Sequence, residues 1–325
     1  MKEQVLSILK TNKDYVSGQE LSDRLSVSRT AIWKAINALK EQGYEIDSVR
    51  NRGYRLIACP DVLFSEEIKS LLTTKWLGRK ILFFDETDST NNEIKRIADY
   101  NKEGILAIAE HQSAGKGRRG RTWESPAGSG IWMSFLLRPC VTPDKASQIT
   151  LIAALAAAEA IRKVTGLEAY IKWPNDIVVN NKKIVGILTE MSTQIDYINY
   201  VVVGIGINVN TEEFPKDISA YASSLKIEGG KNVSRSRIVA ELLESFEKHY
   251  ETFCTDGNLS GIKDEYESML INKGKDVIII EKDTQIVRKA LGIDQSGELL
   301  VQDEYGNITA VFSGEVSVRG LYGYV

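Results

Sequence analysis

The stretch EHQSAGKGRRGRTWESPAGSGIWMSFLL, residues 110–137, decides the fold class of this 325-residue chain. The three glycines of GKGRRGR, residues 115–121, have the G-x-G-x-x-G spacing of a dinucleotide-binding turn. Such a turn requires a strand before it, a helix after it and few cations within it. A strand is predicted at residues 105–110, but residues 122–130 contain a proline and two glycines and cannot begin a helix. The sequence therefore argues against a Rossmann turn, and a Walker loop is excluded because no Gly-Lys pair is followed by Ser or Thr.

The glycine-rich loop carries four cations in seven residues, and a second apolar strand, Ile131–Leu137, is predicted after it. Cations interleaved with glycines are typical of a loop that closes over a polyanion and becomes ordered when the polyanion binds. We therefore predict that residues 113–128 are mobile without ligand. A solvated basic turn is the alternative. The glycines disfavour it, because they cost order and are best explained by close approach of the backbone to a ligand.

Residues 1–60 are predicted to form a winged helix-turn-helix domain that binds DNA. Apolar residues at helical spacing predict two short helices and a third that begins after Ser26-Val27-Ser28, followed by strands at Glu45–Val49 and Tyr54–Ile57. The third helix and the turn between the strands carry side chains that reach phosphates and base edges. The predicted DNA contacts are Ser28, Arg29, Thr30, Lys34, Arg50 and Arg52.

The charge distribution supports DNA binding only modestly. Residues 1–56 hold ten Lys/Arg and seven Asp/Glu, a net charge of +3; the whole chain carries −3, which leaves −6 for the rest. A small helical docking module with solvated cations is the alternative. Cations on both the third helix and the wing favour DNA.

A central domain is predicted over residues 65–270 and a third domain over residues 272–325. Ser65 begins a helix with an acidic first turn, and beyond Gly274 the pattern changes to short strands separated by turns. These predicted strands are Val277–Ile280, Ile286–Leu291, Leu299–Gln302, Ile308–Val311 and Glu315–Arg319. Short strands at this spacing predict a small β-barrel.

The composition is that of a globular chain, with 43% hydrophobic and 26% charged residues. Three widely spaced cysteines, Cys59, Cys140 and Cys254, argue for reduced thiols in the cytoplasm and against a disulfide framework or a zinc site. The first residues lack the apolar core of a signal peptide. The longest apolar stretch, Ile149–Ile161, is too short to span a bilayer. We predict a buried helix there, a cytoplasmic protein and no membrane partner.

Five motifs of the central domain occur in an order and spacing that are typical of one family. They are Asp88-Ser89-Thr90-Asn91, Glu110-His111-Gln112 leading into Gly115–Arg121, Lys172-Trp173-Pro174-Asn175-Asp176, Lys183-Ile184-Val185-Gly186-Ile187-Leu188 and Gly204-Ile205-Gly206-Ile207-Asn208-Val209-Asn210. With them the chain resembles a bacterial biotin protein ligase, and with the winged helix in front it resembles the bifunctional ligase that is also the biotin-operon repressor. The resemblance covers essentially the whole chain. It implies an α+β fold with an N-terminal winged helix-turn-helix, a central class II synthetase-like mixed α/β catalytic domain and a C-terminal SH3-like small β-barrel.

The resemblance also implies a two-step reaction with ATP and biotin as substrates and Mg²⁺ as the metal. The biotin carboxylate attacks the α-phosphorus of ATP to give biotinyl-5′-AMP and pyrophosphate. A lysine of the biotin carboxyl carrier protein of acetyl-CoA carboxylase, or of a similar carboxylase, then attacks the adenylate and releases AMP. A homodimer with biotinyl-5′-AMP as corepressor is implied to bind operator DNA of biotin synthesis and transport genes. The resemblance implies that the dimer forms by edge-to-edge pairing of sheets, and we expect the surface around Val201–Asn208 and the ordered loops beside it to take part.

The site residues that the resemblance and the chemistry imply fall into four groups. Biotin is expected to contact Ser89, Thr90, Asn91, Gln112, Gly115, Lys116, Gly117, Arg118, Trp123, Lys183 and Gly186. ATP is expected to contact Arg118, Arg119, Arg121, Lys172, Asn175, Asn208 and Arg319. Lys183, Arg118 and Asp176 are the predicted catalytic residues, and Asp176 is also the candidate Mg²⁺ ligand or acceptor-lysine base. Lys116 differs from the family, in which arginine is common at this position. Lysine keeps the positive charge but lacks the guanidinium that forms two parallel hydrogen bonds to a phosphate.

Catalysis is expected to come from positioning and charge stabilisation, because the sequence offers no convincing nucleophile. His111 and His249 are the two histidines, and no serine lies in a G-x-S-x-G elbow. Two other classes of protein remain as alternatives. A lipoate or octanoate transferase shares the catalytic core, but the basic loop and the Lys172–Asp176 motif speak against it. A ligand-sensing repressor without activity is disfavoured by the intact Lys183 and Asp176.

Overall fold

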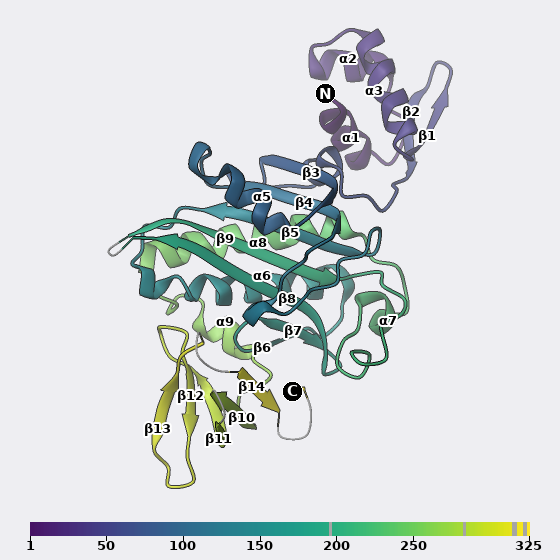
Figure 1. Cartoon of the computed structure of the whole chain (residues 1–325). Helices are drawn as coiled ribbons and strands as arrows, with labels where there is room; N and C mark the ends of the chain where they lie inside the picture. The colour runs from purple at the N-terminus through teal and green to yellow at the C-terminus, as the bar shows by residue number, and fades with distance from the viewer. Residues whose placement is uncertain (195–196, 282–283, 314–316, 321–323) are drawn as a thin grey trace. The chain divides into compact units, whose positions relative to one another are not determined.

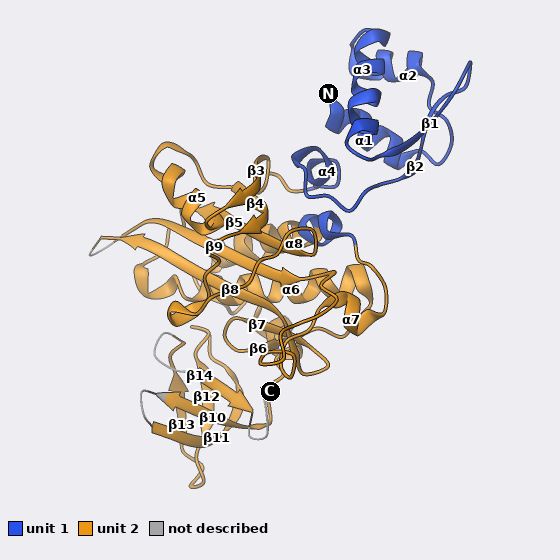
Figure 2. Ribbon diagram, turned by 45° about the vertical axis from the view of Figure 1, so that its right-hand side comes forward, with its two compact units in different colours: residues 1–73, 234–240 blue, residues 74–233, 241–325 orange. Residues whose placement is uncertain are grey.

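The computed structural model describes residues 1–194, 197–281, 284–313, 317–320 and 324–325. Its described residues form two compact units, coloured separately in Figure 2. Unit 1 comprises residues 1–73 and 234–240, and unit 2 comprises residues 74–233 and 241–325. The three domain boundaries expected from the sequence stay predictions. Part of the predicted strand Glu315–Arg319 lies outside the described residues.

Unit 1 has the predicted winged helix-turn-helix arrangement of three helices and a hairpin (Figure 1). Its elements are α1 (Lys2–Thr11), α2 (Gly18–Leu25), α3 (Arg29–Glu41), β1 (Glu45–Val49), β2 (Gly53–Ala58) and α4 (Ser65–Lys69). The Ser17 and Ser28 side chains accept hydrogen bonds from the backbone of the first turns of α2 and α3, so each helix begins at a capping serine. One face of α3, with Ile32 and Ile36, is buried in the core of this unit.

The hairpin of unit 1 depends on one glycine. Gly53 has a φ of +115°, and a Cβ added there would lie 2.1 Å from the Val16 carbonyl oxygen. Val16 and Tyr54 exchange backbone hydrogen bonds of 2.9 Å, which bring the hairpin against the loop before α2. Glycine is therefore required at position 53, because any side chain would push the hairpin away from that loop.

Unit 2 contains a seven-stranded sheet in the order β3-β4-β5-β9-β8-β7-β6. Strands β3 and β4 are parallel, whereas every other neighbouring pair is antiparallel. The basic loop joins β4 to its antiparallel neighbour β5, so the argument against a Rossmann turn is confirmed. The strands are β3 (Lys80–Thr87), β4 (Ile105–Gln112), β5 (Gly130–Leu137), β6 (Tyr170–Lys172), β7 (Asp176–Val179), β8 (Lys182–Thr193) and β9 (Ile198–Asn208).

Helices cover both faces of this sheet. The helices of unit 2 are α5 (Thr90–Ile97), α6 (Gln148–Thr165), α7 (Leu225–Gly229), α8 (Arg235–Asp256, of which residues 241–256 belong to unit 2) and α9 (Lys263–Ser268). On β5, Leu136 packs with Ile94 of α5, whereas the ring centroid of Phe135 lies 4.7 Å from that of Phe246 in α8. Consecutive strand residues point to opposite faces, so α5 and α8 cover opposite faces, and Figure 1 shows α6 beside α8.

The predicted buried helix at Ile149–Ile161 is confirmed as part of α6, which has twelve buried residues. Six of these are alanines, whose small side chains let the helix pack on several sides. Within the described residues, no helix is long and apolar enough to cross a membrane.

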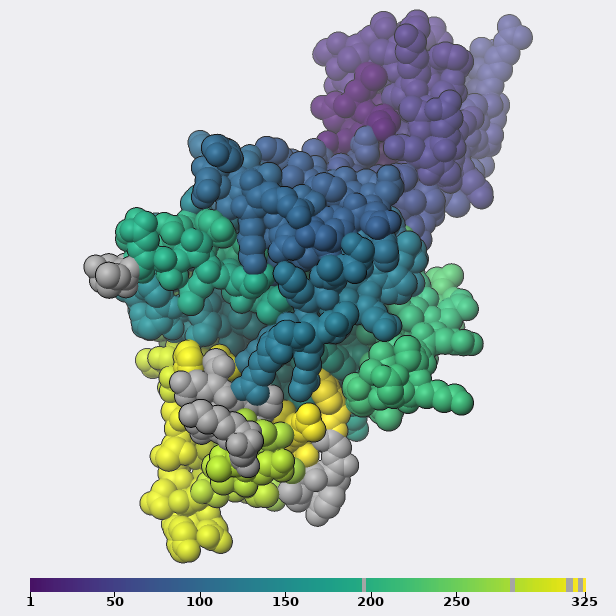
Figure 3. Space-filling model, in the orientation of Figure 1, coloured from purple at the N-terminus to yellow at the C-terminus, as the bar shows by residue number. Residues whose placement is uncertain are grey.

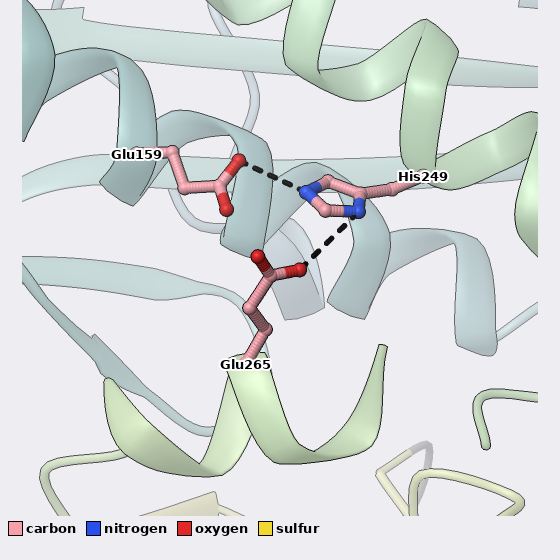
Figure 4. Close-up of side chains that lie close together, drawn as sticks. All are labelled: Glu159, His249 and Glu265. Atoms are coloured by element: carbon pink, nitrogen blue, oxygen red, sulfur yellow. Dashed lines mark hydrogen bonds and ion pairs between the residues drawn. The ribbon is translucent and has the colours of Figure 1, made fainter. Parts of the chain in front are cut away.

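Three helices on the α6 side of the sheet meet at a polar cluster of Glu159, His249 and Glu265 (Figure 4). Nε2 of His249 lies 2.9 Å from a Glu159 oxygen, and Nδ1 lies 3.8 Å from a Glu265 oxygen. The Glu159 oxygen also accepts a hydrogen bond from Ser245. Because the two carboxylates face different ring nitrogens, the cluster resembles a polar clamp between helices more than a convergent metal site.

Strand β9 is not an edge of the sheet, so the expectation that Val201–Asn208 pairs edge to edge is wrong for the strand itself, while the part of the expectation that concerns the loops beside it stays a prediction. Strand β9 pairs with β5 on one side and with β8 on the other, so its backbone hydrogen bonds are already used within the sheet. Val201, Val202 and Val203 are fully buried. The strands at the two edges of this sheet are β3 and β6.

The last part of unit 2 is a five-stranded antiparallel sheet in the order β13-β12-β11-β10-β14. Its strands are β10 (Asp276–Glu281), β11 (Thr284–Ile293), β12 (Leu299–Gln302), β13 (Ile308–Val311) and β14 (Ser317–Gly320). Among the described residues no pairing joins β13 to β14, so closure into a barrel is not confirmed.

Candidate biotin pocket and nucleotide site

A pocket in unit 2 lies where the N-terminus of α5, the basic loop and the glycine-rich parts of β8 and β9 meet. It brings together ten of the eleven residues predicted to bind biotin: Ser89, Thr90, Asn91, Gln112, Lys116, Gly117, Arg118, Trp123, Lys183 and Gly186. Gly115 does not line the pocket but accepts the backbone hydrogen bond of Trp123, at 2.9 Å. The pocket also contains Met133, Asn175, Ile187, Leu188, Gly204, Ile205 and Gly206.

A buried polar network forms one wall of the pocket. The Gln112 side-chain oxygen accepts from the Thr90 backbone N–H at 2.8 Å, and the Thr90 hydroxyl lies 2.7 Å from the Ser134 hydroxyl. Ser134 donates to Asn91 at 2.5 Å, and Asn91 donates to Glu190 at 2.8 Å. Each member holds the next, so the network presents fixed donors and acceptors to a ligand.

The first residues of α5 are positioned from the loop before the helix. The Ser89 N–H donates to the Asp88 carboxylate at 2.8 Å, while the Ser89 hydroxyl makes no capping hydrogen bond and is buried. Hydrogen bonds from Arg96 and Asn92 lower the pKa of Asp88 well below its usual value. Asp88 is therefore an anion that holds the start of α5. The Ser89 hydroxyl is not used as a helix cap and is available to a ligand in the pocket.

Three glycines of the central strands make room for larger side chains. A Cβ on Gly186 would lie 2.7 Å from the Trp123 ring, and one on Gly206 would lie 2.5 Å from Nε1 of that ring. A Cβ on Gly204 would lie 2.1 Å from the Asn91 side-chain oxygen. Trp123 thus lies directly on the sheet, and its buried Nε1 has no hydrogen-bond partner among the described residues. Such a buried donor indicates that a ligand or water supplies the acceptor.

Lys183 and Asp176 form an ion pair at the floor of the site, with Nζ of Lys183 2.6 Å from Oδ1 of Asp176. The same ammonium lies 5.2 Å from the centre of the Trp123 ring. Burial raises the pKa of Asp176, but the charges of Lys183 and Lys172 outweigh it and hold that pKa below its ordinary value. Asp176 is thus an anion that orients Lys183 toward the pocket.

The basic loop lies on the surface of unit 2, where Figure 3 shows the blue-teal chain near residue 120. Lys116, Arg119 and Arg121 are exposed, whereas Arg118 is half-buried. Arg118 donates to Asn175 at 2.8 Å and to the Ser313 carbonyl oxygen. This arginine therefore joins the loop to the Lys172–Asp176 motif and to the C-terminal part of unit 2.

The other residues predicted to bind ATP are only partly brought together. Lys172 is buried, and burial lowers its pKa to about 8. The charge of Asp176 opposes this shift, whereas the charges of Lys183, Arg319 and Arg121 add to it. Asn208 is buried at the end of β9 but does not line the pocket. Arg119, an exposed residue with a φ of +57°, does not line it either.

Several site residues were missed by the sequence analysis. Ser134 and Glu190 complete the polar network, and Met133 and Leu188 line the pocket. Ser134, Glu190 and Met133 lie in apolar or alternating strands without a motif of their own, so no local signal identified them. Leu188 ends the Lys183–Leu188 motif, in which only Lys183 and Gly186 were expected to contact the ligand. Tyr324 was also missed; its hydroxyl donates to Asp176.

The predicted DNA contacts of unit 1 are exposed. Ser28, Arg29, Thr30, Lys34, Arg50 and Arg52 all lie on the surface, the first four at one end and on one face of α3. Ser28 is also the N-cap of α3. The Arg52 guanidinium lies 4.4 Å from the centre of the Tyr15 ring and Arg55 lies 4.6 Å from it, so Tyr15 supports the base of the wing.

Comparison with known proteins agrees with this arrangement. Residues 83–208 match the biotin/lipoate A/B protein ligase family, and residues 2–55 match an HTH domain. The chain thus joins a protein ligase domain to a helix-turn-helix. It is 40% identical over 308 residues to the bifunctional ligase/repressor BirA of Bacillus subtilis, covering 94% of each chain, and 30% identical to the BirA of Escherichia coli over 97% of this chain and 96% of that one. The chain belongs to this family of bifunctional ligase/repressors.

A solved structure gives the same result for the catalytic part. The biotin protein ligase from Aquifex aeolicus, in complex with biotin and ATP, aligns with 74% of this chain and 99% of its own length. The TM-score is 0.65 and the sequence identity is 31%.

Proposed function

We propose that this chain forms biotinyl-5′-AMP from biotin and ATP in the pocket of unit 2 and transfers biotin to a lysine of a biotin carboxyl carrier protein. The observation that carries the proposal is the Lys183–Asp176 pair, 2.6 Å apart, at the floor of a pocket whose walls are a polar network and Trp123. Biotin combines a polar ureido group, an apolar ring system and a carboxylate. The polar network offers partners for the ureido group, the Trp123 indole offers an apolar surface for the rings, and Lys183 offers a positive charge for the carboxylate.

In the adenylation step, two anions must approach each other. The Lys183 ammonium can bridge the biotin carboxylate and the α-phosphate, and Arg118 can stabilise the charge that develops on the phosphate oxygens. Asn175 accepts a hydrogen bond from Arg118 and so orients it. Arg119, Arg121, Lys172, Asn208 and Arg319 stay the proposed partners of the nucleotide.

Asp176 is better suited to orient Lys183 than to bind metal. One of its oxygens pairs with Lys183 and the other accepts from Tyr324, so both oxygens already hold side chains of the protein. We propose that Mg²⁺ enters as the complex with ATP, held mainly by the phosphates. No step of the reaction is assigned to a metal held by the protein.

The second proposed function is repression at a biotin operator, supported by the exposed residues of α3 and the wing. One winged helix makes few base contacts, so we propose that a homodimer reads a two-fold symmetric site and that biotinyl-5′-AMP favours the dimer.

We also propose that the five-stranded sheet is an SH3-like barrel. The proposal is supported by the pairing of its last strand in the sequence, β14, with its first, β10.

Pyrophosphate release from the full-length protein tests the enzyme function. Release is expected with ATP and biotin together, and not with ATP alone or with lipoate in place of biotin. Release that is equally fast with lipoate would identify a lipoate ligase. No release with any acid, combined with tight biotin binding, would identify a sensor without ligase activity.

Sedimentation and operator binding test the repressor function, with and without a non-hydrolysable biotinyl-AMP analogue. The analogue is expected to tighten both dimerisation and DNA binding. Equal affinities in both states would show that unit 1 is not a biotin-responsive switch.

A further inference from the structure

Tyr324 lies among the charged residues of the nucleotide site, and the reaction described above gives it no role. Its hydroxyl donates a hydrogen bond to Oδ2 of Asp176, the oxygen that Lys183 does not use. Its ring centre lies 3.4 Å from Nζ of Lys172. The ring also stacks on Tyr221, with centroids 6.0 Å apart and planes 23° apart. One side chain thus contacts two charged residues of the Lys172–Asp176 motif at once.

We propose that Tyr324 is a positioning residue for adenylation, which holds Lys172 and Asp176 in place for ATP without neutralising the lysine. The proposal rests on the proposed function, because it requires ATP to be the ligand of this site. It adds a residue to the site that belongs to none of the five motifs.

The contact between Lys172 and Tyr324 is useful because the partner of the ammonium is an aromatic ring and not a carboxylate. Lys172 is 5% exposed, and the charge of Asp176 acts on it, but among the described residues no carboxylate forms a direct salt bridge with it. A carboxylate partner would cancel the charge that a phosphate needs. An aromatic face stabilises a buried ammonium and leaves its net charge and part of its N–H donors available.

The Tyr324 hydroxyl holds the second charged residue, Asp176, without changing its charge. With one oxygen of Asp176 paired to Lys183 and the other held by Tyr324, the carboxylate cannot rotate freely, and the Lys183 ammonium keeps its direction. Burial raises the pKa of Tyr324 well above its usual value, so the phenol stays a neutral donor. Tyr324 therefore supports both lysines without adding charge.

Two variants of the full-length protein separate the ring from the hydroxyl. Tyr324→Leu removes both contacts, and Tyr324→Phe removes only the hydrogen bond to Asp176. Tyr305→Leu is the matched control, because Tyr305 is 82% exposed in the turn between β12 and β13. Biotin-dependent pyrophosphate release is measured against ATP concentration and pH, and thermal unfolding checks that each variant is folded.

Tyr324→Leu is expected to raise KM for ATP roughly tenfold, the size of a desolvated cation–π contact. With wild-type protein the alkaline loss of kcat/KM for ATP should follow the Lys172 pKa of about 8. In Tyr324→Leu that loss should move to lower pH, because the unsupported ammonium gives up its proton more readily. Tyr324→Phe should keep the KM and the pH profile and lower kcat by a few-fold, on the order of one hydrogen bond.

Three outcomes overturn the proposal while wild-type protein still releases pyrophosphate. They are an unchanged KM and pH profile in Tyr324→Leu, an equal shift in Tyr305→Leu, or a higher kcat/KM for ATP in Tyr324→Leu, which would mean that Tyr324 obstructs the nucleotide. Absence of biotin-dependent release in wild-type protein would instead contradict the proposed function.

Discussion

The DNA-binding face of unit 1 and the pocket of unit 2 use polar residues in opposite ways. The proposed DNA contacts on α3, such as Arg29 and Lys34, are exposed and project from one helix face. In the pocket, Asn91 and Ser134 are buried, and each depends on partners from other elements. Exposed groups can act almost independently, whereas buried polar groups are costly to leave unpaired and so act as a unit. The two surfaces should therefore respond differently to substitution.

The largest effect is expected for Lys183→Ala, which should lower the rate of adenylation by a factor of about 10²–10³, the usual loss for one charge-stabilising donor. Adding Asp176→Asn to Lys183→Ala should cost little more, because the two side chains form one ion pair. Single-turnover pyrophosphate release measures both, with Lys182→Ala as the control in the same strand. A near-normal rate for Lys183→Ala, or fully additive losses, would contradict the role assigned to the pair.

Gly206→Ala should weaken biotin binding by roughly 10–100-fold, because overpacking a tight site costs about 1–3 kcal/mol. The added methyl would lie 2.5 Å from the Trp123 ring nitrogen and would lift the indole off the sheet. Titration calorimetry with biotin checks the affinity. Gly229→Ala is the control, since its methyl would lie no closer than 3.4 Å to Leu167. Equal biotin affinities for both variants would show that Trp123 does not need the sheet beneath it.

Glu159→Gln should lower the free energy of unfolding at neutral pH by roughly 1–3 kcal/mol, the worth of hydrogen bonds to a buried charged group. Burial raises the pKa of Glu159, but the hydrogen bonds from His249 and Ser245 outweigh it and hold the pKa below its usual value. A lowered carboxyl pKa stabilises the fold above the unfolded-state pKa, and this stability is lost as the pH falls through the folded-state value.

Denaturant unfolding of both proteins at several pH values checks this prediction. The difference between wild type and Glu159→Gln should shrink in acid. Glu168→Gln, whose side chain is 71% exposed, is the control and should change stability by less than about 0.5 kcal/mol. A difference that does not depend on pH would mean that the ionised carboxylate is not what stabilises the clamp.

The most separable effects are expected on the DNA face. Arg29→Ala should weaken operator binding by about 1–3 kcal/mol and relax the sequence preference, as for loss of a base contact. Arg50→Ala on the wing should weaken binding to all sequences alike and reduce the salt slope by about one, as for loss of a phosphate contact. The double variant should be additive, in contrast to the pocket pair. Identical salt slopes and sequence preferences in both variants would show that α3 and the wing are not divided in this way.

The sequence by itself determined the features that depend on local pattern. The winged helix follows from helical periodicity, from the capping Ser28 and from the turn before Gly53, all within sixty residues of chain. The buried helix α6 follows from its apolar run. Most of the pocket was also predicted, because residues such as Ser89, Lys183 and Trp123 belong to motifs that can be recognised one at a time.

The tertiary structure alone decided which distant residues complete those motifs. Ser134 and Glu190 reach Asn91 across the sheet, and their strands have the same apolar pattern that any buried strand has. The strand order places β9 inside the sheet, so β9 is not the edge strand that was expected to pair in a dimer. The alternation of apolar and polar residues along one strand cannot show whether that strand lies at an edge. Tyr324 meets Asp176 from 148 residues away in the sequence. Local pattern determines which elements form, but a contact of this kind depends on how the whole chain packs, because it joins groups that no spacing relates.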